Sequence, residues 1–325
     1  MLGLFCVLHA ARAGGARAGS PIGGYLFAHM LKQDYGRLYY SLSPDGLHWT
    51  LVNRGRRVFP EYLGHPNIVR GRDGRFILTG NPPQGGKVRF WISEDLIHWK
   101  HLGDALPDMS DFPGYESPGK WHGAPKLFYD ADTDRCLLTW HFSNRRKLKE
   151  DPENYWSGMR TFCSTSRDLV KFSKARPLLP FGMATIDVIV RKEKGTYYAF
   201  IKDERYPSFQ WPTGKTIRIC SAKRLLGPYT PPGPPVSPNF REAPTLIPRP
   251  DRHAWYLYFE QYPGIGYGLA VAPRLAGPWY QEYAPLYRVP EGARHGCMIA
   301  LTAAEYRALK TAYGSSSLNA DAKFQ

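Results

Sequence analysis

The chain has 325 residues, with 43 Lys and Arg against 28 Asp and Glu, which gives a formal charge of +15. Hydrophobic residues make up 43% of it, so the chain can bury a large core, and wholesale disorder is excluded. No uninterrupted apolar run approaches the roughly 18 residues that a membrane-spanning helix needs. The 14% of aromatic residues, together with 32 Gly and 29 Pro, favour an all-β protein with many turns over a helical one.

Residues 1–20 have the pattern of a leader segment for secretion. An apolar stretch at 2–8 is followed by Ala-Arg-Ala sequences at 11–13 and 16–18, which suit a cleavage site. No Lys or Arg precedes the apolar stretch, so the basic start of such a leader is missing. We expect a secreted or periplasmic protein, with the cytoplasm as the alternative.

Neither the basic residues nor the cysteines indicate nucleic acid, a membrane or zinc as a partner. The densest basic run, at 145–149, is followed at once by three acidic residues within 150–153, as in a solvated loop that balances its own charge. The five cysteines form no Cys-x-x-Cys pair and no zinc-type cluster with histidine. We therefore expect buried free thiols.

One unit occurs five times along the chain: an alternating strand that ends in a small residue, a turn, and then an aromatic residue. The copies are YYSLSPDGLHW (39–49), RFWISEDLIHW (89–99), TFCSTSRDLVKF (161–172), RICSAKRLLGPY (218–229) and LAVAPRLAGPW (269–279). The turn residues of the first three, which include Asp45, Asp95 and Asp168, suit tight turns. We expect Trp49 and Trp99 to be core residues.

A second unit alternates with the first and begins with a short apolar strand entered through a polar residue. Its copies lie at 64–80, 122–140, 186–204, 241–260 and 294–302. Five paired units, repeating about every 50 residues, predict an all-β fold, a five-bladed β-propeller of four-stranded blades. The first outer unit (25–53) has no inner strand before it and the last inner strand has no outer unit after it. The two chain ends therefore complete one blade.

The repeats divide the chain into a leader at 1–20, a propeller catalytic domain at 21–314 and a disordered tail at 315–325. The wide spacing between the second and third outer units indicates insertions at about 103–120 and 144–157. A short C-terminal helix is expected to begin with a capping box of Thr302 and Glu305.

The inner strands of a propeller run along the central axis, so their first polar residues should gather at one mouth. These residues are His65, His122, Asp187, Glu242 and His295. Two carboxylates close together can have their pKa values driven apart, which keeps one of them protonated as a general acid. The set therefore predicts a catalytic mouth rather than a simple channel lining.

The sequence motifs then resemble those of glycoside hydrolase family 43, the five-bladed propeller glycosidases. The matching segments are YLF (25–27), APKLFYD (124–130), IDVIV (186–190), YYAFIKDE (197–204), REAPTLI (241–247) and PEGARHG (290–296). The likeness runs from about residue 24 to residue 310, and its end resembles arabinosidase- and xylosidase-like members. It implies an exo-acting, inverting glycosidase for plant or algal polysaccharide that contains arabinose, xylose or galactose.

The resemblance also assigns roles. It makes Glu242 the general acid and Asp187 the residue that tunes its pKa. His295 matches a channel histidine that in relatives lies near a bound calcium ion or water. We expect no required cofactor, and a structural calcium ion near the central channel, with His295 as its ligand, is an open alternative. The family's general base is an Asp, but this chain has His65, in Gly64-His65-Pro66.

Three interpretations of His65 remain open. Its imidazole, with an ordinary pKa near 6.5, is itself a competent base. Alternatively, a carboxylate of Glu61, Asp203 or Glu204 reaches the site. In the third interpretation the protein is a catalytically silent propeller that binds glycan without cleaving it. A protein-interaction propeller is a further class, but carboxylates at the inner strands argue against it.

Substrate contacts are predicted from the residues that flank the mouth motifs. Sugar faces stack on aromatic rings, and the candidates are Phe27, Trp121, Trp140 and Trp211, with His122 and Asp203 as polar contacts. Packing inside a blade is the alternative for each aromatic ring. We expect a monomer whose partner is carbohydrate.

Overall fold

The structure is a computed structural model, and it describes residues 21–115, 123–144, 155–262 and 266–314. The predicted leader, the predicted tail and parts of both predicted insertions lie outside the described residues. Within those ranges, no helix is long and apolar enough to cross a membrane.

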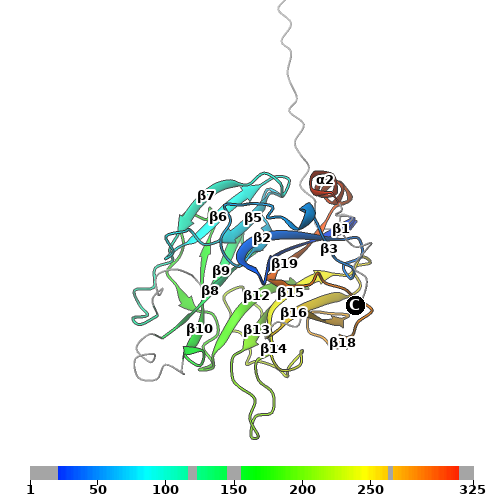
Figure 1. Ribbon diagram of the computed structural model, residues 1–325. Coiled ribbons are helices and arrows are strands. Elements are labelled where there is room, and N and C mark those ends of the chain that lie inside the picture. The colour runs from blue at the N-terminus through cyan, green and yellow to red at the C-terminus, as the bar shows by residue number, and fades with distance from the viewer. Residues whose placement is uncertain (1–20, 116–122, 145–154, 263–265, 315–325) are drawn as a thin grey trace, which may run out of the picture.

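The described residues form five antiparallel sheets (Figure 1). The closing sheet contains β19 (Ala293–Leu301), β1 (Gly24–Leu31), β2 (Asp34–Ser43) and β3 (Thr50–Leu51), and the 3-10 helix η1 (Asn53–Gly55) follows it. The next sheet contains β4 (Asn67–Arg70), β5 (Phe76–Gly80), β6 (Val88–Ser93) and β7 (Lys100–Ala105).

The remaining three sheets follow in chain order. One contains β8 (Gly123–Asp130), β9 (Arg135–Ser143), β10 (Met159–Ser166) and β11 (Arg176–Pro177). Another contains β12 (Thr185–Glu193), β13 (Thr196–Asp203) and β14 (Thr216–Ala222). The last contains β15 (Arg241–Pro248), β16 (Trp255–Gln261), β17 (Gly266–Ala272) and β18 (Tyr280–Glu282).

The first strand of each unit packs against its neighbours in a closed ring. β4 contacts β8, β8 contacts β12, β12 contacts β15, β15 contacts β19, and β19 contacts β4. Figure 1 shows β12, β15 and β19 close together at the centre of the molecule. β1 pairs with β19 antiparallel from Gly24 opposite Leu301 to Leu31 opposite Ala293. The five-bladed propeller, closed by both chain ends, is confirmed.

One blade differs from the prediction, because the sheet of β12 to β14 has three strands rather than four. The segment after β14 still runs beside it: the backbone N–H groups of Thr230, Gly233 and Val236 donate to carbonyls of β14 at 2.8–2.9 Å. Between these donors lie four prolines, within 231–235, which have no N–H to give. Because proline cannot complete a ladder, the fourth strand is replaced by an irregular edge.

The repeated turns share one set of hydrogen bonds. Ser93 Oγ accepts the N–H of Leu96 at 2.9 Å, and Asp95 Oδ1 accepts the N–H groups of Ile97 and His98 at 2.9 and 2.8 Å. The same bonds form in the turns that start at residues 43 and 166. Leu96, with φ of 66°, occupies the left-handed conformation that Gly46 adopts in the first copy. The side-chain bonds therefore hold the turn even without glycine.

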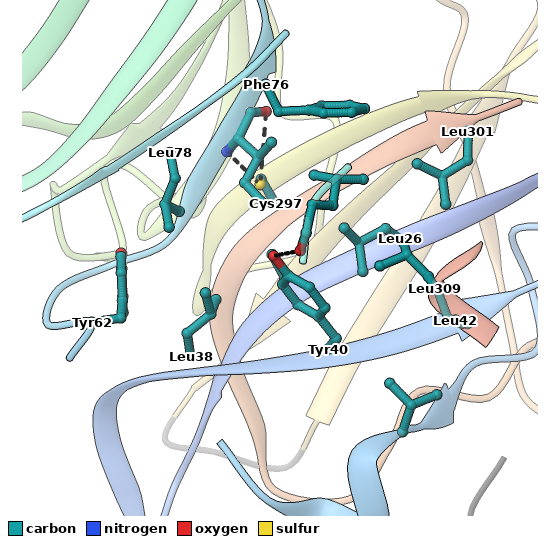
Figure 2. Packing of buried hydrophobic residues seen from close by; sticks show 14 of the residues in the cluster. Leu26, Leu38, Tyr40, Leu42, Tyr62, Phe76, Leu78, Cys297, Leu301 and Leu309 are labelled. Carbon is teal, nitrogen blue, oxygen red and sulfur yellow. Dashed lines mark hydrogen bonds between the residues drawn. The ribbon is translucent and has the colours of Figure 1, made fainter. Parts of the chain in front are cut away.

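Apolar side chains fill the space between blades. Figure 2 shows one such cluster, in which residues of the closing sheet meet Phe76 and Leu78 of β5 and Leu309 of α2 (Ala303–Tyr313). The helix begins with the predicted capping box, and its Glu305 accepts two hydrogen bonds from Arg70 at 2.9 and 3.0 Å. Trp49 is buried as predicted, and so are the four described cysteines, all of them free.

Replacing Asp95 with Ala should lower the free energy of unfolding by about 1–2 kcal/mol, because two turn N–H groups lose their acceptor. The measurement is urea denaturation at neutral pH. Glu94→Ala, at the exposed neighbouring position, is the matched control and should stay within about 0.5 kcal/mol of the wild type. Equal stability of the two variants would contradict a structural role for the repeated Asp.

Candidate active site

Irregular backbone at the start of the inner strands points polar side chains toward one mouth of the channel. The pairing register shifts between Ile186 and Ile189 in β12 and between Glu242 and Thr245 in β15. Within these shifts Asp187 has φ of 52° and Ala243 has φ of 48°, and in β19 His295 has φ of 21°. Bulges of this kind re-aim side chains, and strained backbone of this kind concentrates at functional sites.

A cavity of about 690 Å³ opens where these strands begin. It brings together four of the predicted residues, His65, Asp187, Glu242 and His295. The other main contributors to its wall come from the loops and strand ends around the mouth: Tyr35, His141, Phe142, Ser143, Tyr155, Trp156, Met159, Lys202, Glu204, Tyr206, Lys215 and Tyr262.

Glu242 lies at the centre of the charged part of this cavity. Its Oε1 lies 3.2 Å from His295 Nε2, and its Oε2 accepts a hydrogen bond from Lys202 Nζ at 2.7 Å. Burial raises the pKa of the Glu242 carboxyl, but the bond to His295 and the Lys202 ammonium outweigh burial and hold that pKa well below its ordinary value. In the free protein at neutral pH, Glu242 is a carboxylate.

Asp187 supports the backbone beside Glu242. Its side chain is buried, and its Oδ2 accepts the backbone N–H of Ala243 at 3.1 Å. The N–H of Asp187 in turn donates to His141 Nδ1 at 3.5 Å. Asp187 therefore holds the strained residue that follows Glu242, which fixes the direction of the Glu242 side chain.

Further ion pairs surround the two carboxylates. Lys202 Nζ lies 2.7 Å from Glu204 Oε1, and Lys215 pairs with the other oxygen of Glu204. On the opposite side, Arg294 pairs with the buried Glu260. Burial lowers the pKa of Lys202, but the neighbouring carboxylates outweigh it and raise that pKa above its ordinary value. The buried charges of Lys202, Glu204 and Glu260 thus each have a counter-ion, as their desolvation requires.

His65 faces this cluster from the start of the first inner unit. Its Nε2 lies 2.8 Å from the hydroxyl of Tyr35, and its ring centroid lies 4.7 Å from that of His295. Burial, followed by the charges of His295 and Lys126, holds the pKa of His65 well below its ordinary value. Burial also raises the pKa of Tyr35 to about 12. At neutral pH a neutral imidazole therefore meets a neutral hydroxyl.

The cluster fits a calcium ion poorly. Calcium takes six to eight oxygen ligands. Among the described residues, the acidic and histidine side chains that could hold an ion here are Asp187, Glu242 and His295, whose ligand atoms lie within 4.8 Å of one another and include one nitrogen. Lys202 already occupies one oxygen of Glu242. The ammonium of Lys126 is buried, interacts electrostatically with Asp187, and has no hydrogen-bond partner among the described residues. Lysine ammonium groups thus supply positive charge where a metal ion would be needed.

Three of the predicted substrate contacts have buried side chains that do not line the cavity. Phe27 packs edge-on against Trp49 and Tyr267, with ring centroids 5.8 and 5.3 Å apart. The ring of Trp140 stacks on the ring of Phe162 in a buried apolar cluster. Asp203 is fully buried and accepts hydrogen bonds from arginines on both sides.

The other predicted residues lie in different places. Trp211 is exposed on the loop between β13 and β14, outside the cavity wall. Glu61 is also exposed and does not line the cavity, whereas Glu204 does. Trp121 and His122 lie outside the described residues.

Sequence reasoning missed the residues that complete the charged part of the cavity, chiefly Tyr35, Lys202 and Lys215. Tyr35 lies at the start of β2, four residues before the first copy of the repeated outer motif at 39–49. Lys202 could have been found, since it directly precedes two acidic residues at the mouth end of a predicted strand. No sequence signal marked Lys215, which reaches the site because its loop folds back.

A closed five-bladed propeller with clustered carboxylates and histidines in a cavity at one mouth is a fold suited to acid–base chemistry. Residues 83–307 match the glycosyl-hydrolase-43-related family, described as a probable glycosyl hydrolase domain. Because the match covers more than half of the chain, the protein belongs to this family.

Curated and solved relatives agree with this assignment. An α-L-arabinofuranosidase of Bifidobacterium longum subsp. longum is 28% identical over 167 residues, which cover 47% of this chain but 15% of that enzyme. The crystal structure of a thermostable family-43 glycoside hydrolase matches with a TM-score of 0.51 and 19% identity. The match covers 68% of this chain and 72% of the chain of that hydrolase. An exo-β-1,3-galactanase of Phanerochaete chrysosporium, crystallised with β-1,3-galactotriose, matches with a TM-score of 0.51 and 15% identity. This match covers 69% of this chain and 51% of the galactanase chain.

Replacing Lys202 with Met should lower the free energy of unfolding by about 3–5 kcal/mol at neutral pH, because the buried Glu242 carboxylate loses its ammonium partner. The pKa of folded Glu242 is lowered, so this contribution is present above the unfolded pKa of about 4.3 and is lost as the pH falls from there through the folded value. Urea denaturation of the wild type and of Lys202→Met across this pH range measures the difference in the free energy of unfolding.

Lys100→Met, at an exposed position on β7, is the control for removing a lysine charge. It should change the free energy of unfolding by less than about 0.5 kcal/mol at every pH. If Lys202→Met is as stable as this control, the buried ion pair does not contribute to folding.

Proposed function

We propose that the protein is a glycosidase that hydrolyses O-glycosyl bonds in polysaccharide containing arabinose, xylose or galactose. The observation that supports this most directly is the convergence of Asp187, Glu242 and His295 in one cavity that His65 also lines. The α-L-arabinofuranosidase and exo-β-1,3-galactanase relatives support the sugar class. A cavity at the end of the channel suits the end of a sugar chain, which supports exo action.

In the proposed reaction, Glu242 protonates the leaving oxygen while His65 activates a water on the other face of the sugar, so the configuration inverts. An inverting acid and base stand about 6.5–9.5 Å apart to leave room for that water. Asp187 is too close to Glu242 for this role, since their ligand atoms lie within 4.8 Å. His65 is the alternative: its ring lies 4.7 Å from that of His295, which contacts Glu242, and we propose that the attacking water binds between His65 and the sugar.

The acid needs a proton that the free carboxylate lacks. We propose that Glu242 receives this proton at Oε1, across its 3.2 Å contact with His295 Nε2, when the substrate is bound. The Lys202 ammonium opposes protonation of Glu242, but it keeps Glu204 as a second counter-ion at 2.7 Å when Glu242 is protonated. Asp187 then serves as a positioning residue through the N–H of Ala243.

Glu204 is a poorer candidate for the base. It lines the cavity, but Lys202 and Lys215 occupy its two oxygens. We also propose that the reaction needs no calcium ion, which the lysine charges around Asp187 and Glu242 support. The second candidate function is a silent carbohydrate-binding propeller, favoured by the ionised state of Glu242 and by a histidine in the position of the base.

Sugar release from arabinan, arabinoxylan, xylan, galactan and agar-type oligosaccharides should occur with the wild-type protein, with or without EDTA. Glu242→Gln should lose about 10²–10⁴-fold in rate, because the amide cannot donate the proton. Glu61→Gln, which changes an exposed carboxylate of the same type, is the matched control and should keep full activity.

Full activity of Glu242→Gln on an unactivated glycoside would remove Glu242 from the acid role. Loss of activity in EDTA, restored by calcium, would refute the metal-free proposal. If no preparation releases sugar while both proteins still bind the polysaccharide, the silent binding function replaces the enzyme.

The pH profile of kcat/KM should have an acid limb below pH 6.5. The lowered pKa of His65 keeps the base unprotonated at weakly acidic pH, and activity falls only as the pH drops through that value. His65→Ala should cost about 10²-fold or more and remove this limb. An unchanged acid limb in His65→Ala would assign the base to another residue.

A further inference from the structure

The loop that joins β13 to β14 is an ordered projection beside the cavity. It contains a tight turn, in which the N–H of Ser208 donates to the carbonyl of Trp211 at 2.7 Å and the N–H of Trp211 donates back at 3.2 Å. At its base the N–H of Lys215 donates to the carbonyl of Arg205 at 2.8 Å. Asn239 fixes the returning strand by accepting from Gly214 at 3.1 Å and donating to Pro212 at 3.0 Å.

This loop exposes three aromatic rings. The relative exposure of Phe209 is 98%, that of Tyr206 is 66% and that of Trp211 is 39%. A single exposed aromatic residue is ordinary, but three on one ordered loop form a surface that water solvates poorly. Phe209 lies at the tip of the turn, so its ring is held away from the core rather than packed into it.

The loop is anchored by charge as well as by backbone bonds. The guanidinium of Arg205 lies 4.3 Å from the ring centroid of Trp211, and that of Arg218 lies 5.3 Å from it. Both arginines bind the buried carboxylate of Asp203. The ammonium of Lys215 lies 4.3 Å from the ring of Tyr206. An aromatic surface that is ordered in advance loses little entropy when it binds a ligand.

The exposed rings continue from the wall of the cavity. Tyr206 lines the cavity, and Phe209 follows three residues later, so their Cα atoms lie within about 11 Å of each other. Trp156, which is 45% exposed, also lines the cavity, and Lys215 Nζ lies 5.9 Å from its ring. Aromatic faces therefore extend from the cavity to the tip of the loop.

We propose that the loop 205–215 binds sugar units of a polysaccharide beyond the unit that enters the cavity, with Phe209 as its main contact. This inference rests on the proposed function and narrows it: the substrate is a polymer or long oligosaccharide, not a disaccharide. Sugar rings stack on aromatic faces through their apolar C–H surfaces, and the position of the loop at the rim suits the part of the chain that stays outside.

The test compares kcat/KM on the polysaccharide that the protein cleaves with kcat/KM on the aryl glycoside of the released sugar. In Phe209→Ala, the ratio of polysaccharide to aryl glycoside should fall about five- to tenfold, the effect of one lost ring contact. Tyr283→Ala removes a ring of 74% exposure on a turn that does not line the cavity. In this matched control the ratio should stay at the wild-type value.

An unchanged ratio in Phe209→Ala overturns the inference while leaving the proposed glycosidase intact. A fall in both variants also overturns it, since the effect would then not belong to this loop. If the wild type cleaves nothing, the proposed function fails, and affinity electrophoresis in gels of the same polysaccharides decides. Weaker retardation of Phe209→Ala than of Tyr283→Ala supports the binding surface, whereas equal retardation, or none for the wild type, overturns it.

Discussion

Closure of the ring by β19 against β1 is the constraint on which the site depends. β19 is the last strand among the described residues, and it packs between β15 and β4 while it pairs with β1, the first of them. This pairing brings His295 to Glu242 and completes the mouth. The approach is so close that a Cβ on Gly296 would lie 2.2 Å from the carbonyl oxygen of Ala28. Any side chain at that position would push β19 from β1 and move His295.

The second constraint is electrostatic. Four acidic residues, Asp187, Glu204, Glu242 and Glu260, lie buried or nearly buried around the mouth, where an unpaired charge is costly. The chain meets this cost with its own lysine, arginine and histidine side chains: Lys202 on β13, Lys215 just before β14, and Arg294 and His295 on β19. Because these cations come from two different blades, the charge balance depends on the packing of those blades around the channel.

The features that could be predicted from the sequence are those that the repeated strand units and the alternation of apolar residues encode. The blades, the closure and the inner-strand positions of Asp187, Glu242 and His295 follow from spacing, because equivalent strands of a ring place equivalent residues at the same height. Which aromatic rings face the cavity does not follow, since Phe27 and Trp140 alternate into the blade core within strands buried on both faces. Nor do the partners of Glu242 follow, because they depend on how loops return across the mouth.

His65 and Lys126 both reduce the negative charge of the mouth. A carboxylate base at position 65 would add negative charge beside Asp187 and Glu242 and would need a further cation. A neutral imidazole adds none, and the positive charge of Lys126 helps to keep it neutral by lowering the pKa of His65. The same ammonium offsets Asp187. Exchanging an acidic base for histidine and placing a lysine inside the channel therefore change the net charge of the mouth in the same direction, toward less negative.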